Sequence, residues 1–173
     1  MIRLIDWTAR TWTFDLPVGA FPAVVERVRG TPARAAALVD GVPEHALGAR
    51  VDGAWSAKDH IGHLDDLHDL DDRRLTEFLD GARTLTAADM TNRRTHDANH
   101  ADMPIAVILA RLVAHRAELV ARLDALTEAD VAATAMHPRL QRPMRLVDWL
   151  QFVAEHDDHH LVRAREALRA ARL

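Results

Sequence analysis

A chain of 173 residues is long enough for one domain over residues 1–173, and its 49% hydrophobic and 28% charged residues are typical of a soluble globular protein. The formal net charge of -4 argues against a nucleic-acid partner, and the longest clean apolar stretch, residues 103–110, is too short for a membrane span, so we expect a cytoplasmic protein with no membrane partner. The absence of cysteine excludes disulfides, zinc–thiolate sites and a cysteine nucleophile, whereas eleven histidines favour metal binding.

The N-terminal half of the chain predicts two helical segments. Apolar residues keep one helical phase over residues 21–42, although an internal Gly-Thr-Pro sequence interrupts it, which predicts one kinked helix or two short helices in line. A second helix is predicted over residues 56–80. Ser56 and Asp59 match a capping box at its start, and Gly81 is suited to the left-handed turn that ends it.

The C-terminal half predicts two longer helices. Isoleucine and leucine residues at helical spacing predict a third helix over residues 104–127. The fourth, over residues 145–170, places His156 and His160 on its apolar stripe. The sequence has no sustained strand-like alternation, so the fold class is all-α. Four long helices, each with one apolar face, pack most simply as a four-helix bundle.

Two long connections follow the second and third helices, at about residues 81–103 and 127–144. Loops of this length in a compact domain are usually functional or disordered. Thr127 and Asp130 can cap a short helical turn in the second connection. Both connections contain arginines that can hold a substrate carboxylate, although solvated surface charges are the simpler interpretation. These arginines are Arg93, Arg94, Arg139 and Arg142.

Three histidines are the clearest chemical signal in the sequence. His156 and His160 stand one turn apart, so their imidazoles lie on one helix face, and His63 lies on another predicted helix. One divalent metal bound by all three would keep a coordination position open. The plainer interpretation is a set of core histidines with other hydrogen-bond partners. Nitrogen donors suit Zn, Ni, Fe or Mn better than Ca or Mg.

Two other metal-site patterns fit less well. The segment from His156 to His160 resembles the H-E-x-x-H sequence of zinc proteases, but its second residue is Asp157, whose shorter side chain would place a general base differently. Acid-x-x-His spacings that begin at Asp65 and Asp157 resemble those of di-iron bundles. Those sites also need inward glutamates on the remaining helices, and we find no matching pair.

Two signatures in the sequence resemble those of the DinB-like metalloproteins. The first, in residues 55–64, reads WSAKDHIGHL and has a Trp-Ser opening with a histidine eight residues after the tryptophan. The second, in residues 154–161, reads AEHDDHHL and contains the C-terminal H-x-x-x-H. The resemblance covers about residues 21–169. It implies a four-helix bundle of up-down-down-up type and three metal ligands, which fall on His63, His156 and His160.

Three further residues are candidates for orienting the metal ligands, because each lies next to a ligand position or one turn from it. They are His60, Asp66 and Glu155. Carboxylates at such positions are also commonly just solvated. We expect His68 and His159 to face solvent or to cap a helix.

The resemblance implies a metal-dependent enzyme with a small-molecule substrate. A divalent ion can lower the pKa of bound water to about 7 or acidify a bound thiol. Some members of the superfamily are transferases that use bacillithiol or mycothiol, and any sulfur chemistry in a chain without cysteine must come from a ligand. We therefore expect a thiol-S-transferase or hydrolase, the alternative being a non-catalytic, stress-linked metal-binding module. The family also implies a homodimer. Trp7, Trp12 and the segment from Phe14 to Phe21 are candidates for its contact, although the same residues could instead cap their own core.

Overall fold

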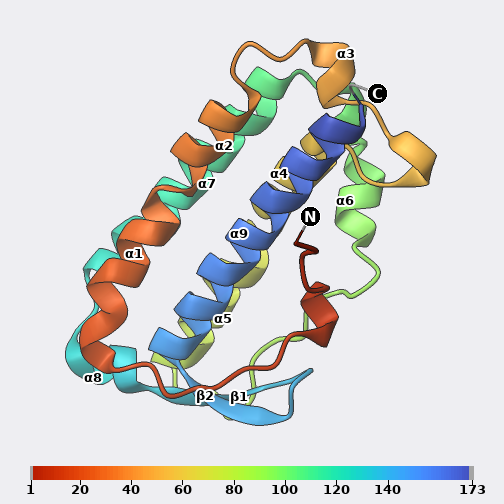
Figure 1. Ribbon diagram of the computed structural model, residues 1–173. Helices are drawn as coiled ribbons and strands as arrows, with labels where there is room; N and C mark the ends of the chain where they lie inside the picture. Colours follow the sequence, from red (N-terminus) through yellow and green to blue (C-terminus); the bar gives the residue numbers. More distant parts are fainter. Residues whose placement is uncertain (1, 172–173) are drawn as a thin grey trace.

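In the computed structural model, which describes residues 2–171, the first helical unit is broken as the sequence predicts. Helices α1 (Phe21–Arg29) and α2 (Thr31–Val39) follow one another nearly in line (Figure 1). The break falls at Gly30 because Pro32 lacks the N–H that would bond to the carbonyl of Val28.

The second unit begins and ends as predicted but is interrupted in the middle. Ser56 Oγ accepts the Asp59 N–H at 3.1 Å and the Asp59 carboxylate accepts the Ser56 N–H at 2.9 Å, which confirms the capping box. Gly81 has φ 70°, which confirms the left-handed turn. However, Leu67, with φ -81° and ψ -4°, divides the helix into α4 (Ala57–Asp66) and α5 (His68–Leu79). Neither glycine nor proline marks that division in the sequence.

The remaining long helices, α7 (Ile105–Asp124) and α9 (Leu146–Ala170), complete a four-helix bundle of up-down-down-up type (Figure 1). The fold class predicted from the sequence is therefore confirmed. The α4–α5 unit and α7 run in the same direction, so the chain between them must return along the length of the bundle. This return explains the long connection after α5, which contains α6 (Arg93–Ala98).

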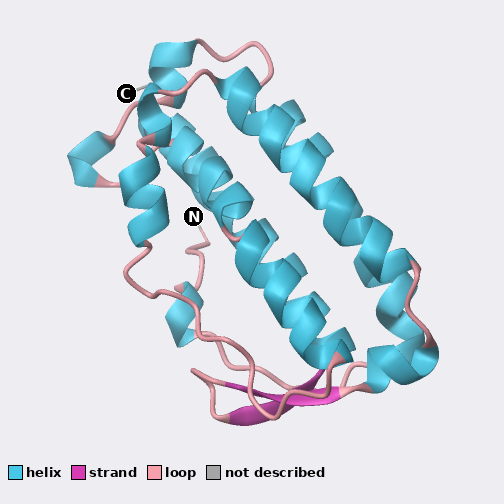
Figure 2. Cartoon of the chain, turned by 180° about the vertical axis from the view of Figure 1, so that it is seen from behind, coloured by secondary structure: helices cyan, strands magenta, loops and turns pink. Residues whose placement is uncertain are grey.

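The second long connection contains a β-hairpin that the sequence analysis did not predict. Helix α8 (Glu128–Ala132) has the expected Thr127 capping box, and strands β1 (Thr134–His137) and β2 (Arg142–Arg145) then pair antiparallel. The hairpin lies at one end of the bundle (Figure 2). Strands of four residues are too short to show alternation, and Pro143 weakens the strand signal further. The short elements are α3 (Glu44–Leu47) and the 3-10 turns Trp7–Ala9, Val18–Ala20, Val51–Gly53 and His100–Asp102.

Two apolar clusters fill the bundle, and a layer of buried polar residues lies between them. One cluster surrounds Trp149 and the other surrounds Ile61. In the layer between, the Asp157 carboxylate accepts hydrogen bonds from Thr31 Oγ1 at 2.7 Å and Arg116 Nη2 at 3.1 Å. The polar layer runs at the level of the predicted metal ligands.

None of the helices described is both long and apolar enough to cross a bilayer.

Candidate metal centre

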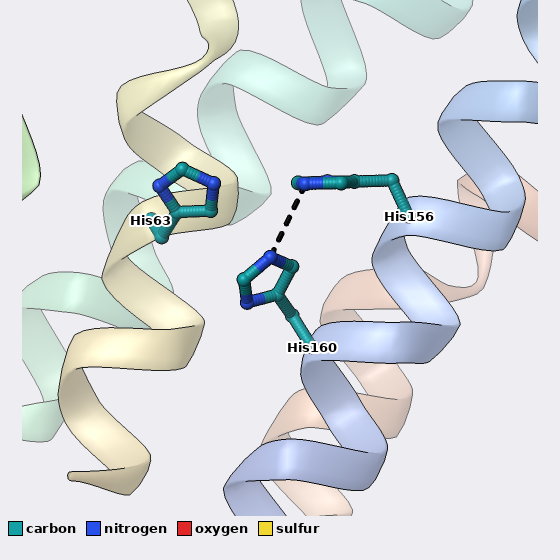
Figure 3. A group of neighbouring side chains, drawn as sticks. All are labelled: His63, His156 and His160. Atoms are coloured by element: carbon teal, nitrogen blue, oxygen red, sulfur yellow. Dashed lines mark hydrogen bonds between the residues drawn. The ribbon is translucent and has the colours of Figure 1, made fainter. Parts of the chain in front are cut away.

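The three predicted ligands face one another across the interface between α4 and α9. His63 projects from α4 toward His156 and His160, which stand one turn apart on α9 (Figure 3). One ring nitrogen from each residue lies within 4.8 Å of the others, and the Nε2 atoms of His156 and His160 are 3.2 Å apart. The fold thus brings His63 to two histidines that lie more than 90 positions later in the sequence.

The donor set fits a divalent transition-metal ion. Two nitrogen ligands at about 2.0–2.1 Å from one metal lie roughly 2.8–3.4 Å apart for bond angles between 90° and 110°, and the Nε2 atoms of His156 and His160 have such a separation. Burial lowers the pKa of His63 to about 4 and holds the pKa values of His156 and His160 well below the ordinary range. The rings are therefore neutral at pH 7, as metal ligands must be.

His60 is the hydrogen-bond partner of one candidate ligand. Its Nδ1 lies 3.0 Å from Nδ1 of His160. A His160 ring that turns Nε2 to a metal carries its proton on Nδ1, and this N–H donates to His60. Burial lowers the pKa of His60 to about 4, which keeps its Nδ1 lone pair free to accept. The Trp55 ring packs against both His60 and His63, with centroids 5.3 and 5.2 Å away.

The sequence suggested that Asp66 orients the ring of His63 directly, but the structure places Thr95 between the two side chains. Nδ1 of His63 lies 2.9 Å from Oγ1 of Thr95 on α6. The Asp66 carboxylate accepts the Nε2–H of His100 at 2.8 Å. Burial opposes ionisation of Asp66, but the hydrogen bonds from His100 and Thr95 hold its pKa below the ordinary value. Thr95 therefore accepts from His63 and donates to Asp66.

His100 fits beside α4 because residue 62 is glycine. A Cβ atom at Gly62 would lie 2.4 Å from Cγ and 2.5 Å from Nδ1 of the His100 ring, far inside van der Waals contact. The ring is 1% exposed and fills the space that a side chain would occupy. Gly62, His100 and Asp66 thus form one packed unit behind His63.

Glu155, the other acidic candidate, faces away from the histidines. Its carboxylate accepts hydrogen bonds from Arg10 and Arg27, each at 2.7 Å. These contacts keep the pKa of Glu155 low although burial raises it. Consecutive helix positions point about 100° apart, so Glu155 meets α1 and the N-terminal segment while His156 meets α4. Glu155 is therefore not placed to orient the ring of His156, although the two residues are neighbours in the sequence.

The histidine cluster opens into a cavity of about 550 Å³. Aromatic rings line the part near the cluster, and Trp7 of the N-terminal segment packs edge-on to His156 with ring centroids 4.9 Å apart. Charged residues line other parts of the same wall, among them Asp71, whose burial raises its pKa to about 6. A cavity of this size accommodates a small molecule.

The other histidines and the loop arginines have mixed outcomes. His159 was expected to face solvent, but it is only 7% exposed and lies against Trp7 with ring centroids 5.7 Å apart. His68 stacks on His115 near the surface. Of the four loop arginines, Arg139 alone lines the main cavity. The others are Arg93, which is exposed, Arg94, paired with Asp69, and Arg142, bonded to the carbonyl of Trp12.

Several residues of the site were not singled out from the sequence. They are Thr95, Arg74 and Arg116, which sit outside both signatures, together with His100 and His137, for which no role had been assigned. A glycine in the interior of a predicted helix is the one local signal that was available. Gly62 is unfavourable there by about 1 kcal/mol relative to alanine, which indicates a close neighbour.

Comparisons with known proteins agree with this fold. The sequence model of the DinB superfamily matches residues 27–162, a range that includes all three histidines. No curated protein matches the sequence. Among solved structures, the chain is similar to YfiT from Bacillus subtilis, described as a probable metal-dependent hydrolase with an unusual four-helix bundle topology. The TM-score is 0.78, the identity is 18%, and the match covers 92% of each chain.

Proposed function

The chain belongs to the DinB superfamily, and on that basis we propose that it is a metal-dependent enzyme that activates water or a small thiol for attack on an electrophilic substrate. The observation that carries the proposal is the convergence of His63, His156 and His160 in the wall of a cavity large enough for a small molecule. The likeness to YfiT, which is described as a probable metal-dependent hydrolase, supports the same class.

In this proposal, three histidines bind the metal and two further residues orient their rings. A divalent ion supplies Lewis acidity that lowers the pKa of a water or thiol ligand. His63, His156 and His160 hold the ion through their ring nitrogens. His60 and Thr95 fix the orientation of two of these rings through the second nitrogen, a contact that typically changes metal affinity by about 10–100-fold.

The nucleophile distinguishes a hydrolase from a thiol-S-transferase. The chain has no cysteine, so a transferase needs a small thiol cosubstrate of the bacillithiol or mycothiol type. A hydrolase needs water alone. Turnover of an electrophile such as a chloronitrobenzene, followed with and without added thiol, separates the two reactions because only the transferase rate rises with thiol concentration.

Elemental analysis of the purified protein tests the metal site. We expect about one divalent ion per chain, and we expect His156→Ala and His160→Ala each to lose it. His45→Ala, on the short surface helix α3, is the matched control and should keep the ion. Full metal content in both cluster variants would remove the site assignment and the proposed function with it.

Activity and ligand access test the catalytic part separately. His63→Ala should lower the rate of the metal-loaded enzyme strongly, and an unchanged rate would remove the catalytic claim. Azide or imidazole should perturb the spectrum of a Ni or Co form if a coordination position is open. A site that resists both ligands favours the non-catalytic module.

The homodimer and the cytoplasmic location stay predictions. Trp7 and Trp12 were the candidate dimer contact, but both rings pack against Phe152 of their own chain, with centroids 4.8 and 4.7 Å away. Both tryptophans therefore pack against their own core, and Trp7 also lines the cavity. Sedimentation of the purified protein measures its oligomeric state.

A further inference from the structure

We infer that the cavity binds a carboxylate at the part of its wall formed by Arg74, His137 and Arg139, and that the substrate is a carboxylate-bearing electrophile. That the substrate is an electrophile rests on the proposed function. The carboxylate site itself rests on hydrogen-bond donors that three separate elements turn toward one cavity.

Two guanidinium groups in this wall have N–H donors to spare. Arg74 on α5 is 4% exposed, and its one described hydrogen bond is from Nε to the Thr86 carbonyl at 2.9 Å. Arg139, in the turn between β1 and β2, has a buried Nη2 with no partner among the described residues. A buried donor without an acceptor is costly, so the arrangement suits an anionic ligand that supplies the acceptors.

His137 adds a third donor to this wall. Its side chain is 2% exposed, and its Nδ1 accepts the N–H of Leu140 at 3.2 Å. The proton of the neutral ring is therefore on Nε2, for which no acceptor is described. Burial, together with the charges of Arg74 and Arg139, lowers the pKa of His137 to about 4. All three side chains line the same cavity.

The charges in this wall favour a monoanion. The Asp157 carboxylate already accepts hydrogen bonds from Arg116 and Thr31, and the buried Nη1 of Arg116 has no partner within residues 2–171. No hydrogen bond to the Asp71 carboxylate is described. Burial raises its pKa, and the charges of Arg116 and Arg74 oppose that effect.

Three guanidinium groups and two carboxylates line the less exposed part of this wall, where the positive charge is in excess by one. A third carboxylate, Asp89, lies at the exposed rim, where solvent screens its charge and the backbone N–H groups of Thr91 and Arg93 donate to it. A single carboxylate balances the wall better than a phosphate dianion does.

The position of these donors relative to the histidines sets the shape of the ligand. Positions 63 and 74 are eleven residues apart on the successive helices α4 and α5, which at 1.5 Å per residue is a rise of about 16 Å. Apolar side chains of Leu67, Leu70, Phe152 and Val153 line the cavity as well. A ligand with an apolar body and a terminal carboxylate can therefore reach the arginines with one end and the histidine cluster with the other.

Calorimetric titration with 4-phenylbutyrate and its neutral amide, 4-phenylbutanamide, tests this site. The two probes have the same shape, so a difference in affinity reports the charge. We expect the carboxylate to bind at least about tenfold more tightly, because hydrogen bonds to charged groups contribute that much. Arg139→Gln should abolish this preference, whereas Arg142→Gln, on the same hairpin but outside the cavity wall, should preserve it.

The titration is run on the protein as purified and again after dialysis against a chelator. A preference that survives chelation supports the arginine site, and one that disappears shows that the carboxylate had bound at the metal, which overturns the inference. Equal binding of both probes, stronger binding of inorganic phosphate, or an unchanged preference in Arg139→Gln overturns it as well. Arg74→Lys, which keeps the charge but removes the planar fork, is the second variant should Arg139→Gln fail to fold. The test needs neither metal nor turnover, so failure of the proposed function leaves its result readable.

Discussion

The packed unit behind His63 makes Gly62→Ala an informative perturbation. Alanine in place of glycine inside a helix ordinarily stabilises a protein by about 1 kcal/mol. At position 62 the new Cβ would lie 2.4–2.5 Å from three atoms of the His100 ring, so the ring must move by about 1 Å to restore van der Waals contact. The hydrogen bond from His100 to Asp66, now 2.8 Å long, cannot survive such a shift.

The expected cost follows from these two effects. Overpacking of a tight core costs about 1–3 kcal/mol, and loss of a buried hydrogen bond to a charged group costs about 1.5–3 kcal/mol. After the helix-propensity gain is subtracted, Gly62→Ala should lower the free energy of unfolding by about 1.5–5 kcal/mol. Urea unfolding followed by circular dichroism, with the slope checked against the parent protein, measures this difference.

Two comparisons make the result specific. Gly19→Ala is the matched control, because a Cβ there meets nothing within 4 Å, and it should leave the unfolding midpoint close to that of the parent. In a His100→Ala background the ring is gone, so Gly62→Ala should become neutral or stabilising. If the substitution costs the same with and without the His100 ring, or costs nothing at all, the reasoning about this contact is refuted.

Two more predictions concern the ligands and the titrating groups. Thr95→Val removes the acceptor for Nδ1 of His63, so it should weaken metal binding by about 10–100-fold in a chelator competition. Thr91→Val, in the same connection, is the control and should leave the metal affinity unchanged. Equal metal affinities of the two variants would disprove the role of Thr95. Burial and the nearby arginines lower the pKa of His137 from 6.5 to about 4 in the folded protein. Between pH 6.5 and 4 the unfolded chain therefore binds one more proton than the folded chain, so the free energy of unfolding decreases as the pH falls through this range. In the metal-free protein, His137→Asn should reduce the dependence of the free energy of unfolding on pH by about 1.4 kcal/mol per pH unit in this range. An unchanged pH dependence in urea unfolding would contradict the lowered pKa of His137.

Interactions between residues close in sequence determined the helices, and these were predictable from the sequence alone. The capping box at Ser56, the turn at Gly81 and the break before Pro32 each depend on atoms within about four residues. The spacing of His156 and His160 likewise places both rings on one helix face in any context. The match of two signatures to one family supplied the third histidine, His63, and the topology of the bundle.

The tertiary structure alone decided what surrounds the histidines, because those contacts join segments that no local rule relates. Asp66 meets His100 across 34 positions, and Glu155 meets Arg10 across 145. The donors of the proposed carboxylate site come from α5 and a hairpin too short to be predicted. A side chain's partners depend on the direction in which its helix is rotated against distant neighbours, and that rotation is set by the packing of the whole bundle.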